Sequence, residues 1–320
     1  MSSGYIFTTK SALQSAVNAW IEDQSNAVNT YGDINTWDVS AITDFSDLFA
    51  NKVAFNSDIS SWDVGSGTDF SRMFFSANSF NQDIGGWDVS SGTNFGSMFN
   101  NADVFNQDIG SWDVSAGSVF RHMFSKADAF NQDISSWNVS SGTNFSEMFA
   151  NASEFNQDIS NWDVSSGTDF IAMFADADAF NQNISNWQVS DTATLTDMFS
   201  SAELMLSNYG LGSTPTSSEF NRTIFTDRNS LDAAITAWIA DETAATATYG
   251  DINTWDVRAI TDFSELFKDK TTFNSDISNW DVSSGNDFSG MFYGAEDFNQ
   301  NIGSWQVSDS ALLTNMFFDA

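Results

Sequence analysis

Tryptophan recurs at a fixed interval of 25 residues through most of this chain of 320 residues. The repeated residues are Trp37, Trp62, Trp87, Trp112, Trp137, Trp162 and Trp187, followed by Trp255, Trp280 and Trp305. A constant period of this length is typical of stacked repeats, in which each repeat buries its apolar side against its neighbours. The sequence therefore predicts a stack of coils.

One coil reads FNQDISSWNVSSGTNFSEMFANASE, residues 130–154. Trp137 and Val139 alternate with polar neighbours, which predicts a short strand, and Gly142 follows as a turn residue. The next apolar residues fall at i, i+3, i+4 and i+7 of one helix face: Phe145, Met148, Phe149 and Ala152. The predicted fold class is therefore an α/β repeat solenoid of stacked strand-turn-short-helix coils, of the leucine-rich-repeat type.

A second, longer repetition indicates two tandem modules. The string YGDINTWDV begins at Tyr31 and again at Tyr249, and IFT begins at Ile6 and again at Ile224, both 218 residues apart. Each copy opens with apolar residues at helical spacing, which predicts N-terminal capping helices over about 9–24 and 227–242. These residues are Leu13, Val17, Trp20 and Ile21, then Leu231, Ile235, Trp238 and Ile239.

The predicted domains follow from this duplication. Residues 1–203 form a module with seven tryptophan coils, and residues 223–320 form a second module with three. Residues 204–222 hold two glycines and the chain's one proline, Pro215, which predicts a linker.

Charge restricts the partners. There are 43 Asp and Glu against 10 Lys and Arg, a net charge of −33. Nucleic acid is disfavoured because phosphate binding needs a basic surface. No apolar segment is long enough to predict membrane insertion. There is no cysteine, and the N-terminus has no secretory signal pattern. We expect an extracellular, cell-surface or virion location.

The string FNQDISSWNVSSGTNFSEMF, together with WDVSAITDFSDLF in the opening coil, resembles the BspA-like leucine-rich repeat proteins. Gly replaces the Val of that family's repeat in most coils, and Phe replaces the first Met of its helix. The resemblance implies a surface-exposed adhesive repeat protein with no catalytic residues to carry over.

Two columns of aspartates are candidate sites. The column before each tryptophan comprises Asp58, Asp83, Asp108, Asp133 and Asp158; the column after it includes Asp38, Asp63, Asp88, Asp113 and Asp163. Stacked carboxylates repel, and calcium between the coils would relieve that repulsion. The alternative is a ladder of acceptors for backbone N–H groups. Asn138 and Asn183 replace carboxylates in these columns, which favours the ladder; calcium is the weaker alternative, and no other cofactor is expected.

The exposed strand-face column of aspartates and the helix-side columns, one of which varies from coil to coil, are candidate binding surfaces. The residues that we select as binding candidates are Asp63, Asp88, Asp113, Asp163, Arg72, Arg121, His122 and Glu147. His122 is the single histidine, and nothing near it predicts a catalytic set. An enzyme is therefore not expected.

The sequence favours a non-enzymatic surface scaffold that binds protein or glycan in adhesion or recognition. The alternative is a structural or decoration component of a virion or surface layer, whose partners would be other subunits. Glycan stacking on the aromatic columns and a lattice-matching flat face are less favoured, because the aromatic residues alternate with core residues and the strand face lacks paired threonines.

Overall fold

The computed structural model describes residues 4–209, 212–220 and 222–320. The chain forms two compact units, Met1–Ser217 and Ser218–Ala320, which we describe separately. The elements of unit 1 are α1 (Lys10–Glu22), α2 (Gln24–Tyr31), η1 (Ile34–Thr36), α3 (Glu203–Tyr209) and η2 (Ser217–Glu219), the last of which reaches into unit 2. Those of unit 2 are α4 (Arg228–Ala240), α5 (Glu242–Tyr249) and η3 (Ile252–Thr254).

Each unit begins with a pair of helices at the predicted capping positions. Asp23 ends α1 and also begins α2, where its carboxylate accepts a hydrogen bond from the Asn26 N–H at 3.0 Å. Asp241 does the same between α4 and α5. The described helices are too short and too polar to cross a membrane.

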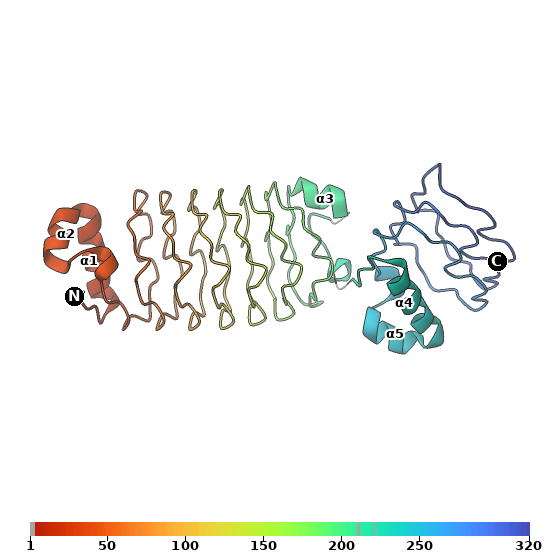
Figure 1. Ribbon diagram of the computed structural model, residues 1–320, viewed down its shortest axis with the longest axis horizontal. Helices are drawn as coiled ribbons and strands as arrows, with labels where there is room; N and C mark the ends of the chain where they lie inside the picture. Colours follow the sequence, from red (N-terminus) through yellow and green to blue (C-terminus); the bar gives the residue numbers. More distant parts are fainter. Residues whose placement is uncertain (1–3, 210–211, 221) are drawn as a thin grey trace. The chain divides into compact units, whose positions relative to one another are not determined.

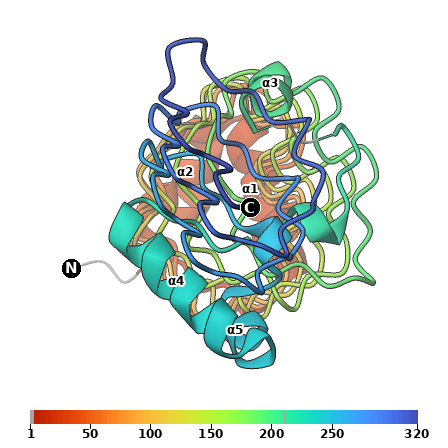
Figure 2. The same cartoon turned by 90° about the vertical axis from the view of Figure 1, so that its right-hand side faces the viewer.

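Behind the helices, unit 1 is a row of coils held together by backbone hydrogen bonds (Figure 1). The N–H of Phe145 donates to the carbonyl of Asp169 at 2.8 Å, and the N–H of Phe149 donates to the carbonyl of Met173 at 2.9 Å. The same bonds recur one coil away, so every coil is hydrogen-bonded to the next. Seen end-on in Figure 2, the coils of unit 1 nearly superpose, as a fixed repeat requires.

The predicted fold class is wrong. In the described residues the coils contain neither a strand of sheet length nor a helix after the glycine; the only β-pairing between described coils consists of isolated parallel bridges such as Asn144 to Asp169. An α/β solenoid of strand-turn-helix coils is therefore not what this sequence forms.

The predicted short helix fails because of backbone geometry. Glu147 and Asn151 both have left-handed φ values, 51° and 57°, which an α-helix does not tolerate. Between them the chain makes tight turns, with the Met148 N–H donating to the Phe145 carbonyl at 3.1 Å. Phe145, Met148 and Phe149 are nevertheless fully buried. The apolar spacing thus identified the core correctly but assigned it to the wrong element.

The predicted strand around Trp137 is also absent. Trp137 is buried, and its indole N–H donates to the Ile109 carbonyl of the preceding coil at 3.0 Å. Its ring stacks on that of Trp112 with centroids 6.4 Å apart and planes 3° apart. The coils therefore hold each other here by side chains rather than by a β-ladder.

The two units end differently. In unit 1, α3 covers the last coil, Met205 is fully buried, and the Phe199 N–H donates to the Ser213 carbonyl at 3.0 Å. The segment predicted as a linker therefore contains α3 and part of the core. In unit 2, the equivalents of buried Leu195 and Phe199 are Leu313 and Phe317, which are 51% and 50% exposed.

The left-handed residues generate a prediction about stability. Ala172 has φ 50°, and its equivalent in unit 2, 118 residues later, is Gly290 with φ 63°. A left-handed Ala costs about 1–2 kcal/mol, whereas Gly loses only about 0.5–1 kcal/mol of backbone entropy. Ala172→Gly should therefore raise the free energy of unfolding by up to about 1 kcal/mol.

Ala175→Gly is the matched control in the same coil. Ala175 is buried and does not have a positive φ. Its replacement should lower the free energy of unfolding by about 0.5–1 kcal/mol. Chemical denaturation of both variants measures the effect, and equal destabilisation by the two substitutions would refute the role of the left-handed geometry.

A second prediction concerns the tryptophan column. Trp112 is buried, and its indole N–H donates to the Ile84 carbonyl at 3.1 Å. Trp112→Ala should destabilise unit 1 by about 3–5 kcal/mol. Trp112→Phe keeps an aromatic ring but leaves the carbonyl unpaired, so it should cost about 1–3 kcal/mol. If Trp112→Phe were neutral in denaturant unfolding, the indole hydrogen bond would contribute nothing.

Candidate functional site

The variable column predicted as a binding surface lies on the left-handed positions of unit 1. The column comprises Asp47, Arg72, Ser97, His122, Glu147, Ala172 and Asp197, all with φ between 50° and 58°. The apolar residues next to this column in sequence, such as Phe145 and Met148, are repeated and buried. The side chains of this column therefore differ from coil to coil, while the buried residues next to them stay the same.

Two pairs of neighbours in this column lie within ion-pair distance of each other. Arg72 Nε lies 2.7 Å from Asp47 Oδ1, and the guanidinium also lies 4.0 Å from the Phe75 ring. His122 Nδ1 lies 3.3 Å from Glu147 Oε2. Exposed ion pairs such as these contribute only about 0–1 kcal/mol to stability. The side chains are therefore available for exchange with a ligand.

The structure does not gather all the predicted binding residues into one site. Ser97 separates the Arg72 pair from the His122 pair in the column. Arg121 is exposed, and the described residues include no ion-pair partner for it. The candidates are therefore parts of an extended surface that runs along several coils.

The aspartates after each tryptophan bind the backbone of their own turn. The carboxylate oxygens of Asp63, Asp88, Asp113 and Asp163 accept hydrogen bonds from the N–H two residues later, at 3.0–3.1 Å. Ser90 Oγ also donates to Asp88 at 2.6 Å. Asn138 makes the same two bonds with Ser140. A neutral acceptor therefore replaces the carboxylate without loss of the turn.

The aspartates before each tryptophan behave in the same way. Asp58, Asp83, Asp108, Asp133 and Asp158 accept the N–H two residues later at 2.9–3.0 Å. All five are exposed. Within the described residues, no group of three or more acidic or histidine side chains has an arrangement suited to a metal ion. The observed hydrogen bonds are those of the backbone-acceptor ladder.

These hydrogen bonds shift the acidity of several carboxyl groups. Hydrogen bonds from the side chain and then the N–H of Ser115 lower the pKa of Asp113. Ser165 lowers the pKa of Asp163 by the same means. At Asp88 the bonds from Ser90 lower the pKa, although the charge of Asp113 opposes them. The charged forms are thus stabilised by local donors despite repulsion along the column.

A polar ladder that the sequence analysis missed runs along the coils. Asn106 Oδ1 accepts the N–H of Asn131 at 3.0 Å and the side-chain amide of Gln132 at 2.9 Å. The same pair of bonds links each coil to the next from Asn56 to Gln182, and Asn274 to Asn299 and Gln300 in unit 2. The unchanged string Phe-Asn-Gln was the signal that would have revealed it.

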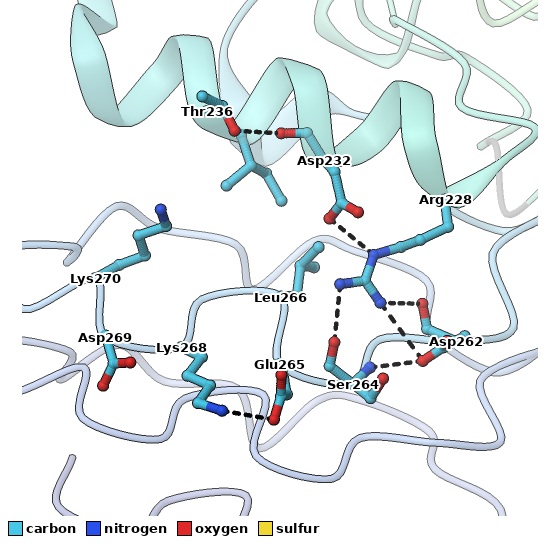
Figure 3. Close-up of a pocket in the computed structure, with 11 residues that line it drawn as sticks. Arg228, Asp232, Thr236, Asp262, Ser264, Glu265, Leu266, Lys268, Asp269 and Lys270 are labelled. Carbon is cyan, nitrogen blue, oxygen red and sulfur yellow. Dashed lines mark hydrogen bonds and ion pairs between the residues drawn. The ribbon is translucent and has the colours of Figure 1, made fainter.

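The helix pair meets the first coil of unit 2 at a pocket of about 570 Å³ (Figure 3). Arg228 extends from α4, and its guanidinium donates to the carbonyls of Asp262 and Ser264 at 3.0 and 2.8 Å. In the next coil, the equivalent carbonyls of Asp287 and Ser289 accept N–H groups from the coil before. Arg228 therefore supplies the donors that a preceding coil would otherwise provide.

The electrostatics of this pocket are mixed. Burial favours the neutral form of Asp262, but hydrogen bonds from Ser264 and the charge of Arg228 lower the pKa of Asp262 overall. Lys268 lies 2.7 Å from Glu265, and that hydrogen bond raises the pKa of Lys268. Figure 3 shows both interactions beside α4. Since the charges largely pair with each other, the pocket serves to attach the helix to the coil.

Comparison with known proteins identifies the chain first as a tandem-repeat protein. The model of the family described as "Mycoplasma protein of unknown function, DUF285" matches residues 17–129, 118–211 and 235–320. These segments cover most of the chain, so the chain belongs to the DUF285 family, and the prediction of a tandem repeat is confirmed. No curated protein and no solved structure matched the chain.

The lowered carboxyl pKa values predict a dependence of stability on pH. A carboxyl whose pKa is lower in the folded state than the ordinary 3.8 stabilises the fold above that value and loses this contribution as the pH falls through the folded pKa. Asp113→Asn should therefore reduce the loss of stability between neutral pH and about pH 3. Asn138→Asp, the reverse change, should increase it. Thermal melts at both pH values measure the difference, and identical pH dependence in all three proteins would exclude this linkage.

Proposed function

We propose that this protein is a non-enzymatic repeat scaffold that binds protein or glycan at a cell surface or in the extracellular space. The observation that carries the proposal is the left-handed column: its side chains change from coil to coil, whereas the buried residues beside them are repeated. A rigid support with varied, accessible side chains is what recognition by a repeat protein requires. The general family match and the resemblance to BspA-like adhesive proteins add support.

The proposal also assigns no catalytic role to the protein. His122 Nδ1 lies 3.3 Å from Glu147 Oε2, and among the described residues no serine hydroxyl hydrogen-bonds to its ring. Almost every carboxylate has a copy one coil away that makes the same turn. Catalysis needs a convergent set of unlike groups, whereas this surface repeats the same groups along its length.

The proposal is tested by direct binding of the full chain to a panel of extracellular glycoproteins and immobilised glycans. One variant replaces Arg72, Arg121, His122 and Glu147 by Ser, the residue that already occupies the column at Ser97. A second replaces Asp63, Asp88, Asp113 and Asp163 by Asn, as at Asn138. The matched control carries Ser25→Ala and Asn29→Ala in exposed positions of α2.

We expect one of the two surface variants to weaken binding by roughly tenfold or more, since several polar contacts of about 1 kcal/mol each would be lost. Melting temperatures should change little, because exposed substitutions seldom affect stability. No binding to any member of the panel would refute the proposal, and equal affinity of all variants would refute the assignment of binding to these two surfaces.

A further inference from the structure

Unit 1 has a pocket between its helix pair and its first coil. It has a volume of about 490 Å³ and is lined by Trp20, Ile21, Gln24 and residues 51–57. Two of its aliphatic side chains are largely exposed, Ile21 at 41% and Val53 at 57%. Ile21 belongs to the apolar helix face expected to be buried, so its exposure beside a cavity needs an explanation.

The first coil also lacks one partner of the asparagine ladder. In later coils the N–H of each ladder asparagine donates to a carboxamide oxygen of the coil before, as Asn81 does to Asn56 at 2.9 Å. Asn56 has no such predecessor, and its N–H has no hydrogen-bond partner among the described residues. Because the N–H groups of later ladder asparagines donate to the preceding coil, the Asn56 N–H is expected to face the helix pair, and Asn56 itself is an exposed residue that lines the pocket.

The residue after Asn56 adapts the ladder to the helix pair. Later coils have glutamine there, but the first coil has Ser57, whose hydroxyl accepts the indole N–H of Trp20 at 3.0 Å. Ser57 therefore accepts a hydrogen bond where the glutamines of later coils donate one to the preceding coil, and the acceptor for the Asn56 N–H is still lacking among the described residues. The pocket therefore combines a donor that elsewhere binds an amide oxygen with an apolar wall.

We propose that this pocket binds the acetamido group of an N-acetylhexosamine glycan, an inference that rests on the proposed function. The acetamido oxygen accepts the Asn56 N–H, and its methyl group contacts Ile21 and Val53. An Asn or Gln side chain from a partner protein fits less well, because its NH₂ group would lie against the apolar wall without a hydrogen-bond acceptor. A neutral sugar is also not repelled by the net charge of −33.

Unit 2 provides an internal comparison. A pocket of about 460 Å³ overlaps the corresponding place in unit 2: it shares the ladder residue, Asn274, and the bond from Trp238 to Ser275 at 2.9 Å, but it is also lined by Asp251 and Asp276. Glu242 takes the place of Gln24, however, and Thr271 that of Val53. Ile239 keeps the place of Ile21, but neither Ile239 nor Thr271 lines this pocket, whereas Glu242, Asp251 and Asp276 do. Because the pocket lacks the aliphatic contact and is lined by carboxylates, the acetamido group should bind to unit 1 alone.

The experiment titrates the full chain with triacetylchitotriose and, as matched control, with cellotriose, which has the same sugar linkage but no acetamido groups. We expect one glycan per chain and a roughly tenfold or greater preference for the acetylated sugar, since both an apolar contact and a hydrogen bond are lost without it. The amide NMR signal of Asn56 should shift with the acetylated sugar, and that of Asn274 should not.

Surface variants complete the test. Val53→Thr, which introduces the residue of unit 2, should weaken binding by roughly tenfold, and Ile21→Asn should do the same. Thr271→Val in unit 2 is the matched control and should change nothing. Both positions in unit 1 are exposed enough for these variants to fold, which their melting temperatures check.

Equal binding of the two sugars, no binding, or unchanged affinity of Val53→Thr would overturn the pocket assignment. So would tighter binding of an asparagine-containing peptide at the same amide signals. If the full chain instead binds a panel ligand through its left-handed column, the assignment of the pocket fails while the proposed function stands. If triacetylchitotriose binds as expected and neither column variant affects any ligand, the pocket stands and the column is excluded.

Discussion

The structure depends on hydrogen bonds between successive coils. Each coil turns too tightly to satisfy its own backbone, so alternate N–H groups, such as those of Phe145 and Glu147, donate to the next coil. Unpaired buried backbone groups are costly, and this fixes both the stacking and the period. The left-handed residues are a consequence: Glu147 and Asn151 must reverse the chain so that these N–H groups face the neighbouring coil. The strained positions are therefore required by the stack.

The same constraint explains what happens where a stack begins. A first coil has acceptors and donors with no preceding coil to meet them, and the helix pair supplies substitutes. Arg228 reaches two carbonyls in unit 2, whereas in unit 1 Gln14 donates to the Leu48 carbonyl at 3.0 Å. The duplicated units meet the same requirement with different side chains, and the Asn56 N–H is left without a protein partner among the described residues.

From the sequence, the buried residues and the repeat period could be predicted, but the backbone conformation of the coils could not. The burial of Phe145, Met148 and Phe149 follows from their apolar character, and the repeat follows from the tryptophan period. Their spacing, however, is compatible with an α-helix and with a stack of tight turns, and only the φ values at Glu147 and Asn151 distinguish the two. The left-handed positions cannot be recognised by residue type, because residues as different as Ala172 and Arg72 occupy the same column. The sequence therefore predicted which positions form the candidate surface. It did not predict that Arg72 pairs with Asp47 of the preceding coil.

The repeated aspartates have a structural role, because they accept hydrogen bonds from the backbone of their own turns. A carboxylate that accepts the N–H of its own turn gains a local donor, and the lowered pKa of Asp113 reflects that gain. Asn138 supplies the same acceptor without charge, so the turn itself does not require a carboxylate. The charge then acts on the surroundings, because −33 over one chain favours solubility and repels anionic partners. The left-handed column and the pocket between α1 and the first coil do not accept the N–H of their own turn in this way, so the proposed recognition would leave these turns unchanged there.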